Sequence, residues 1–255
     1  DTITQRQVLS YLVRTTVYLG DYAASLQCAR RLFALGQSAA EVRWHHYGRV
    51  MLGLTHLCYG QIAEARAYLF DDQLQLPKDL ACMAAGARAL YLARVGRTGE
   101  AHHQLEQAIR ACQQEPINIL LGVDSYRILG EGALLLLERA RTDSERRAAA
   151  ALCRPAIGIL RSFALRSPHG RADLCLQEGR LALMQGRTRL AAWLFGRAHS
   201  LAGPYQMGPT AALSLCWRGR AKSGAAGRHL IQQGLAQLRL FGPCWEVDEI
   251  SSWPV

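Results

Sequence analysis

The nearest approach to a phosphate-binding loop is the run Gly219-Arg-Ala-Lys222-Ser223. A P-loop requires one glycine directly before the lysine and another five residues earlier, because its backbone amides surround the phosphates. Those two positions hold Ala221 and Cys216 here. The local pattern also predicts a helix followed by a turn, whereas a P-loop needs a strand followed by a helix. We therefore interpret the run as a basic turn between two helices and expect no nucleotide cofactor.

Two adjacent histidine pairs, His45-His46 and His102-His103, raise the question of a metal site. Neighbours on a helix point about 100° apart, so a pair cannot chelate as an i, i+4 couple does. In the run Trp44-His-His-Tyr47 we expect a buried aromatic beside exposed histidines. The acidic pair Asp71-Asp72 falls at an expected helix end, as solvated charge, and no Gly-x-Ser-x-Gly elbow occurs. We expect no metal, no cofactor and no active site, so this chain is not expected to be an enzyme.

Arginine is the chemically distinctive residue of the chain. The formal net charge is +10, and lysine occurs only at Lys78 and Lys222. Residues 1–125 hold 12 basic and 11 acidic side chains, whereas residues 126–255 hold 18 and 9. The excess of basic over acidic side chains in residues 126–255 has two interpretations. It predicts a docking surface for an acidic partner, or it reflects a compositional bias that places arginine on every exposed helix face. Aromatic residues for base stacking are not interleaved with it, which argues against nucleic acid. The candidate patch consists of Arg141, Arg146, Arg147, Arg154 and Arg161.

The cysteine spacing and the lengths of the apolar runs indicate in which cellular compartment the protein is expected. The eight cysteines lie 22 or more residues apart without a CxxC pair, which favours buried free thiols in a reducing cytoplasm. The longest uninterrupted apolar runs fall well short of the roughly 20 residues of a spanning helix, so we expect no membrane partner. The chain begins at Asp1 without a signal-peptide pattern, and we interpret it as a piece of a longer polypeptide.

A repeated pattern of glycine and small residues organises most of the chain. Small side chains at fixed offsets let two helices cross at close range, and glycine supplies the left-handed residue that ends the first helix of each pair. The expected N-cap positions of the second helices hold side chains with a capping oxygen, namely Asp21, Thr98 and Thr188. The turn glycines are Gly20, Gly60, Gly96 and Gly186. The small residues five positions later are Ser25, Ala65, Ala101 and Ala191.

The pattern predicts an all-α fold of about six helical hairpins without an internal domain boundary. We expect one repeat domain over residues 1–241 and a capping tail over 242–255, in which Trp245 and Trp253 help to close the array. The repeat register is least regular between residues 115 and 170, where Pro155 is expected to start or kink a helix. The expected hairpins span about 4–35, 39–71, 78–114, 117–163, 171–202 and 207–241.

These offsets resemble the tetratricopeptide repeat, with four units matching clearly and two weakly. Turn spacings near 40 residues are similar to the repeat domain of the MalT-type transcription activators, which also occurs in related signal-transduction ATPases, adenylate cyclases and kinases. The run Gly242-Pro-Cys-Trp-Glu-Val247 resembles the stretch that often ends such arrays. The resemblance implies a right-handed α-superhelix, or solenoid, whose repeats follow an ATPase module and act as a sensor or docking arm.

The resemblance also implies that the first helix of each hairpin lines a concave face that holds a peptide or a small regulator. We therefore expect a non-catalytic protein-interaction or sensor arm of a larger signalling protein, which binds a peptide, a partner protein or a small inducer. Two alternatives stay open: a fragment of an adenylate cyclase or kinase whose catalytic domain lies upstream, and a basic repeat array that binds nucleic acid. The residues on those helices that could reach the groove are Tyr47, Arg94, Tyr126 and Arg180.

Overall fold

The computed structural model describes residues 2–38, 42–70, 76–114 and 124–253, and the regular structure among them is entirely helical. The all-α prediction is confirmed for this part of the chain. The expected start of the fourth hairpin at 117 and the acidic pair Asp71-Asp72 lie outside the described residues. The α-helices are α1 (Thr2–Leu19), α2 (Tyr22–Ser38), α3 (Val42–Cys58), α4 (Ile62–Leu69), α5 (Lys78–Arg94), α6 (Thr98–Gln114), α7 (Asp124–Arg139), α8 (Asp143–Arg166), α9 (Gly170–Met184), α10 (Thr188–Ala202), α11 (Gly208–Lys222), α12 (Gly224–Arg239) and α13 (Trp245–Ser251).

Consecutive helices pack in pairs, and glycine ends the first helix of most pairs. The φ angles of Gly20, Gly60, Gly96 and Gly186 lie between 74° and 84°. A residue with a Cβ adopts this left-handed region only at a cost of roughly 1–2 kcal/mol, so glycine determines where these helices end. The prediction that these four glycines close helices is confirmed.

Two second helices begin with a side-chain cap. Asp21 Oδ1 accepts a hydrogen bond from the Ala24 amide at 3.0 Å, as predicted. Thr142 Oγ1 accepts from the Glu145 amide at 3.2 Å while the Glu145 carboxylate accepts from the Thr142 amide at 3.1 Å, which forms a capping box at the start of α8. The predicted caps at Thr98 and Thr188 are wrong, because these residues are already the first of α6 and α10. Arg187 precedes α10 without a side-chain cap.

Pro155 lies inside α8, so the expectation that it starts a helix is wrong, while the expected kink stays a prediction. A proline within a helix leaves the carbonyl four residues earlier without its usual donor. That carbonyl belongs to Ala151, which is exposed, so water can replace the missing donor.

The small residues of the repeat pattern lie where helices meet. Ser25, Ala65, Ala101 and Ala191 are all fully buried. The Ser25 hydroxyl donates to Val13 O of α1 at 3.1 Å and lies 3.1 Å from Thr55 Oγ1 of α3, so it connects three helices. The pattern therefore identifies the crossing points of the helices correctly.

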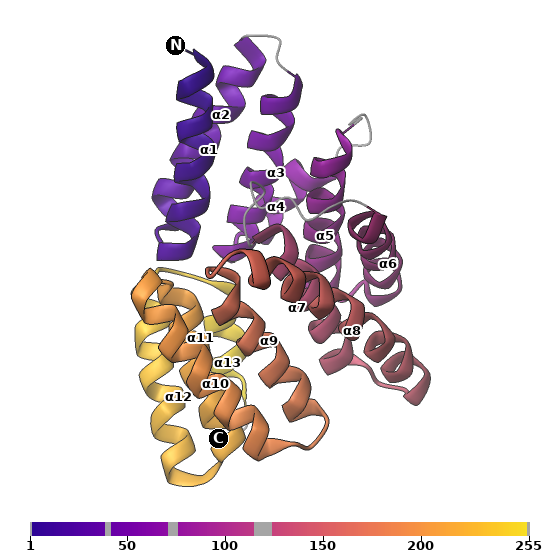
Figure 1. Cartoon of the computed structure of the whole chain (residues 1–255), viewed down its shortest axis with the longest axis vertical. Helices are drawn as coiled ribbons and strands as arrows, with labels where there is room; N and C mark the ends of the chain where they lie inside the picture. The colour runs from indigo at the N-terminus through magenta and orange to yellow at the C-terminus, as the bar shows by residue number, and fades with distance from the viewer. Residues whose placement is uncertain (1, 39–41, 71–75, 115–123, 254–255) are drawn as a thin grey trace.

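The pairs follow one another along a curved path, and the last pairs return to the first (Figure 1). The lower end of α1 meets α11. The largest buried cluster runs from α1 to α8 and also includes Ala212, Cys216, Ile231 and Leu238 of α11 and α12. Trp245, Glu246 and Ile250 of α13 share a small cavity with residues of α5, α7, α9 and α11, so α13 lies on the inner side of the curve.

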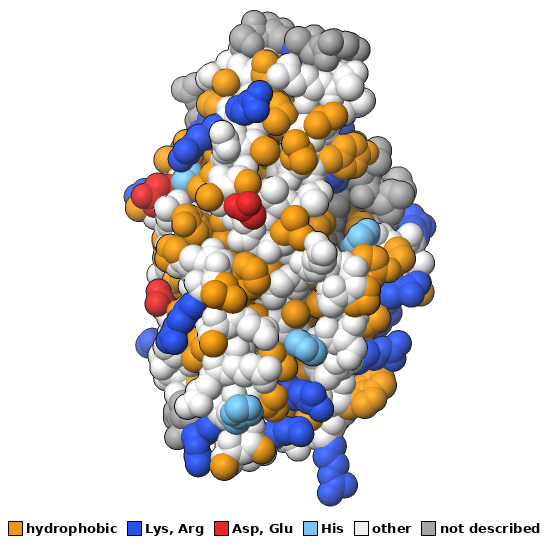
Figure 2. Space-filling model, turned by 90° about the vertical axis from the view of Figure 1, so that its left-hand side faces the viewer, with side chains coloured by type: hydrophobic (Ala, Val, Ile, Leu, Met, Phe, Trp, Pro, Cys, Tyr) orange, Lys and Arg blue, Asp and Glu red, His pale blue; other side chains and the backbone are white. Residues whose placement is uncertain are grey.

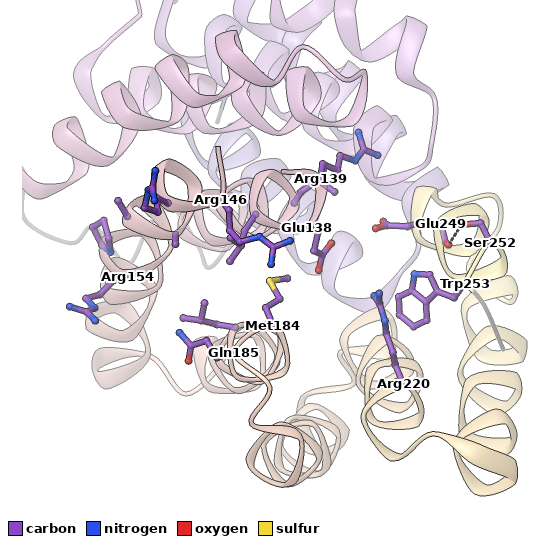
Figure 3. Close-up of a pocket in the computed structure, with 17 residues that line it drawn as sticks. Glu138, Arg139, Arg146, Arg154, Met184, Gln185, Arg220, Glu249, Ser252 and Trp253 are labelled. Carbon is purple, nitrogen blue, oxygen red and sulfur yellow. Dashed lines mark hydrogen bonds between the residues drawn. The ribbon is translucent and has the colours of Figure 1, made fainter. Parts of the chain in front are cut away.

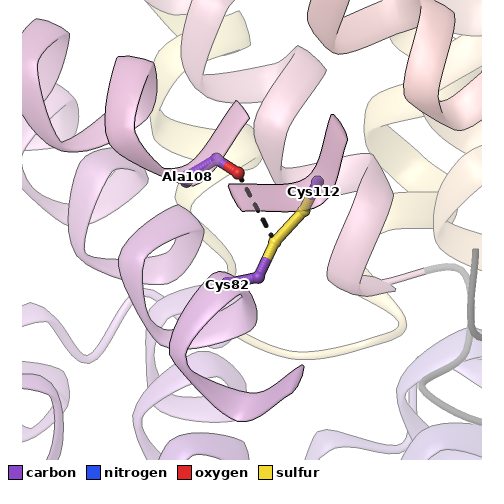
Figure 4. Close-up of a disulfide and its surroundings, with 3 residues drawn as sticks. All are labelled: Cys82, Ala108 and Cys112. Atoms are coloured by element: carbon purple, nitrogen blue, oxygen red, sulfur yellow. Dashed lines mark hydrogen bonds between the residues drawn. A yellow bond between two sulfur atoms is a disulfide. The ribbon is translucent and has the colours of Figure 1, made fainter. Parts of the chain in front are cut away.

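Cys82 of α5 and Cys112 of α6 form a disulfide, with Cα atoms 6.2 Å apart (Figure 4). The prediction of free thiols is therefore wrong for this pair. The two residues are 30 positions apart and meet only because α5 packs on α6, which spacing rules for CxxC motifs do not detect. Since disulfides are typical of oxidising compartments, the argument from thiols to a reducing cytoplasm does not hold for this pair. The remaining six cysteines are free.

On the face shown in Figure 2, apolar side chains extend over the whole length of the molecule, and Lys and Arg are most frequent at one end. Val8, Tyr11 and Leu12 of α1 are 43–53% exposed. The end rich in Lys and Arg is the one that carries the C-terminal helices. Among the described residues, α8 alone has the length and composition to cross a membrane, and half of its apolar stretch is buried within the fold, as in a core helix.

Candidate functional site

A groove opens between α7, α8, α9 and α11 and the C-terminal segment (Figure 3), and we call it the basic groove. It encloses about 990 Å³, the size of a site for a small molecule or a short peptide segment. Leu135, Leu181 and Met184 supply apolar surface, and Trp253 lines it from the C-terminal segment. Its positive charge comes from Arg139, Arg146, Arg147, Arg154 and Arg220.

Three of these arginines belong to α8. The capping box fixes where α8 begins, and Arg146 and Arg147 follow within its first two turns. Arg154 is seven residues beyond Arg147, about two turns, so these two side chains lie on one face of the helix. All three are exposed, and no ion pair joins them to another described residue. Figure 3 shows Arg146 pointing inward toward Glu138 and Arg154 pointing outward at the edge of the groove.

Arg139 and Arg220 are held in place by their neighbours. Arg139 donates to the carbonyl oxygens of Ala93 and Arg94 at 2.5 and 3.0 Å, which ties the end of α7 to the end of α5. The Arg220 guanidinium lies 4.5 Å from the ring centroid of Trp253. Both therefore place a positive charge beside a groove that is open to solvent.

The carboxylates at the groove already have partners. Glu138 accepts from Arg180 Nη2 at 3.0 Å, and Glu249 accepts from Trp245 Nε1 at 3.0 Å. Burial raises the pKa of Glu138, against the attraction of Arg180. Glu138 is therefore compensated by Arg180, and the five arginines that line the groove outnumber its two glutamates, so the groove presents positive charge beside apolar surface.

A buried set of ion pairs lies deeper, behind the basic groove, and we call it the inner ion cluster: Arg94, Arg127, Glu131 and Glu246. Arg94 Nη2 contacts Glu131 at 2.9 Å and Glu246 at 3.1 Å, while Arg94 Nη1 donates to Leu57 O at 2.6 Å. Arg127 Nη1 contacts Glu131 at 3.1 Å. The cluster joins α3, α5, α7 and α13 through one central guanidinium.

The two carboxylates of the inner ion cluster differ in acidity. Burial alone would raise the pKa of Glu131, but the charges of Arg127 and Arg94 outweigh burial and lower it. Burial raises the pKa of Glu246, and repulsion from Glu131 adds to this effect against the attraction of Arg94. The surroundings therefore shift the pKa values of these two glutamates in opposite directions.

The structure separates the four residues expected on a concave face. Tyr47 and Tyr126 are buried among packed helices, with Tyr126 against the ring of Phe163, and neither lines a described cavity. Arg94 and Arg180 do line one inner cavity, where both are engaged by glutamates.

The expected arginine patch is also only partly brought together. Arg146, Arg147 and Arg154 meet at the basic groove. Arg141 lies in a separate groove beside the turn that joins α5 and α6, and Arg161 pairs with Glu178 at 2.7 Å on the exposed surface. Sequence reasoning missed Arg139, Arg220 and Trp253 as groove residues.

His45, His46 and the first glycine of the glycine-lysine run pack against neighbouring parts of the fold. His46 is buried and His45 is half-buried, stacked on Phe33 at 4.3 Å, so the expectation that both are exposed is wrong. Burial lowers the pKa of His46. Among the described residues, no cluster of His, Cys, Asp or Glu could hold a metal ion. Gly219, the first residue of the glycine-lysine run, packs directly on α12.

No known family model matches this chain, and no curated protein matches it either. The geometry of the basic groove and the inner ion cluster is therefore the basis for any functional assignment.

Proposed function

We propose that this chain is a non-catalytic protein-interaction module, built as a right-handed superhelix of about six tetratricopeptide-like hairpins. The paired helices, the left-handed glycines at corresponding turns and the buried small residues after them support this architecture. By resemblance to MalT-like repeat domains, we propose that it serves as a docking or sensor arm in a larger regulatory protein. The six free cysteines support a cytoplasmic location for it, whereas the Cys82–Cys112 disulfide is an argument against a reducing compartment. An array of this kind holds its partner against a surface formed by several hairpins.

The basic groove is the proposed docking site, and its partner is an acidic protein segment. The observation that carries this proposal is the set Arg146, Arg147 and Arg154: three exposed cations on one helix, unpaired within the described chain, beside apolar surface. Arginine binds carboxylates through a planar, bidentate fork and also stacks on aromatic rings. An acidic segment that carries a few apolar side chains would match both properties of the groove.

The test is binding of a fluorescein-labelled helical peptide rich in Glu and Leu, measured by fluorescence anisotropy. Changing Arg146, Arg147 and Arg154 together to Glu should weaken binding at least tenfold, or about 1.4 kcal/mol. Binding to the wild type should also weaken as salt rises. The matched control reverses three exposed arginines elsewhere, Arg189, Arg228 and Arg239, which changes the net charge equally and should leave affinity within about twofold.

Three results would contradict the proposal. Equal loss of affinity in both triple variants would show attraction by overall charge and not by the groove. Tighter binding of a single-stranded oligonucleotide than of the peptide would favour the nucleic-acid alternative. Absence of any binding by the acidic peptide at low salt would remove the groove as a docking site.

A further inference from the structure

The segment 242–253 turns back from the end of α12 into the inner side of the fold. Gly242, with a φ of 91°, makes the reversal and passes close to the ring of Tyr59. The chain then passes the turn glycine Gly60 and enters α13. The segment thus reaches from the last helix pair to the ends of α3 and α5, against surfaces contributed by several earlier pairs.

Its anchors are acidic and aromatic side chains on arginines. Glu246 pairs with Arg94 at 3.1 Å. The Trp245 ring lies under two guanidinium groups, 5.3 Å from that of Arg94 and 5.7 Å from that of Arg139. This is the chemistry that the basic groove offers to an acidic partner, already used by a segment of the same chain.

A second aromatic anchor lies at the far end of the segment. Trp253 stacks edge-on against Trp217 of α11, with centroids 4.7 Å apart, and its ring lies 4.5 Å from the Arg220 guanidinium. Arg139, Arg220 and Trp253 all line the basic groove as well, so the space occupied by the segment is continuous with the groove.

The attachment of the segment is small in extent. α13 has seven residues, and isolated helices of that length are unstable in water. Within 242–253, only Cys244 and Ile250 are fully buried, whereas Asp248, Ser251 and Ser252 are exposed. A few side-chain contacts therefore hold the segment, and another helix that provides the same contacts could replace it.

We infer that segment 242–253 is a built-in occupant of the docking surface, which leaves when an acidic, tryptophan-bearing helix of a partner protein binds to Arg94, Arg139 and Arg220. This inference rests on the proposed function and adds the form of the partner and its regulation. The closed segment lowers the apparent affinity in proportion to the fraction of molecules that are open. Release uncovers the Trp217 ring and the inner arginines and extends the basic groove inward.

The experiment uses the full chain and a labelled peptide that copies residues 243–253, with serine in place of Cys244. In the variant Trp245→Ala/Glu246→Ala the segment loses two anchors, so the peptide should bind at least tenfold tighter than to the wild type. Adding Arg220→Ala to that variant should reverse the gain. The control is Asp248→Ala, an exposed residue of the same helix, which should leave affinity unchanged.

Hydrogen exchange on the wild-type chain tests the displacement of segment 242–253 without the use of a variant. The α13 amides should exchange much faster than those of α11, and addition of the peptide should speed them further. Amides of α13 as protected as those of α11, or a folded Trp245→Ala/Glu246→Ala variant that binds no tighter, would overturn the inference. The proposed function would fail differently, through the loss of any effect of the Arg146, Arg147 and Arg154 substitutions on the acidic peptide.

Discussion

The close approach of α11 and α12 gives the sharpest stability prediction. A Cβ added at Gly219 would lie 2.5 Å from Gly227 O and 3.0 Å from Ile231 N, both backbone atoms of the neighbouring helix. Ordinary carbon contacts are at about 3.5 Å or more, so relieving the contact with Gly227 O would require α11 and α12 to separate by about 1 Å. Gly219→Ala therefore forces a shift of two whole helices.

The expected magnitude follows from two opposing effects. Overpacking of this kind costs typically about 1–3 kcal/mol. Alanine recovers up to about 1 kcal/mol because it is the better helix former. Because the contacted atoms belong to the backbone, the overpacking cost should lie in the upper part of that range, at about 2–3 kcal/mol. Gly219→Ala should thus lower the free energy of unfolding by about 1–2 kcal/mol, which for a chain of this size lowers Tm by roughly 2–8 °C.

Gly158→Ala is the matched control, because it is the same substitution inside a helix. A Cβ at Gly158 would meet nothing within 4 Å, so only the helix-propensity gain remains. Its Tm should rise by roughly 1–4 °C. Thermal unfolding followed by far-ultraviolet circular dichroism measures both. If Gly219→Ala proved as stable as Gly158→Ala, the close packing of α11 on α12 would be refuted.

Three further predictions concern buried chemistry. Changing Cys82 and Cys112 to Ala removes the cross-link that closes a loop of 30 residues, and it should lower the free energy of unfolding by about 3–4 kcal/mol. Dithiothreitol should lower the Tm of the wild type but not that of the variant. Burial raises the pKa of Asp173 to about 6, so the wild type gains stability as the pH falls through 6. Asp173→Asn should therefore be more stable than the wild type by at most about 3 kcal/mol near pH 8. A difference in the free energy of urea unfolding that persists at pH 4 would contradict this assignment. Arg94→Ala should destabilise by about 3–5 kcal/mol, because it leaves the buried Glu246 without its partner and Glu131 with Arg127 alone. Adding Glu246→Gln should restore part of the loss, and strict additivity of the two changes in urea unfolding would show that they do not interact.

The helices were predictable because their signals are local. Each turn needs a left-handed residue at one position and a small residue five positions later, and Gly20 with Ser25 or Gly186 with Ala191 shows both in the sequence. Thr188 shows the limit of this reasoning, since a shift of one residue turns an expected cap into the first residue of the helix.

The basic groove could be predicted only in part, because it depends on which helices meet. Arg146, Arg147 and Arg154 are neighbours along α8, so their clustering was visible in the sequence. Arg139 and Arg220 join them only through the folding of α7 and α11 around the tail. The disulfide has the same origin, as two cysteines 30 residues apart become neighbours through helix packing alone.

The contact between α1 and α11 changes how the molecule is expected to come apart. In an open array each unit touches only its neighbours, so the ends can fray one unit at a time. Here the first and last helix pairs support each other, and the buried cluster that contains α1 also contains residues of α12. Loss of either end exposes the other, so we expect the chain to unfold in a single cooperative step, and to fold more slowly than an open array because that contact joins distant parts of the sequence.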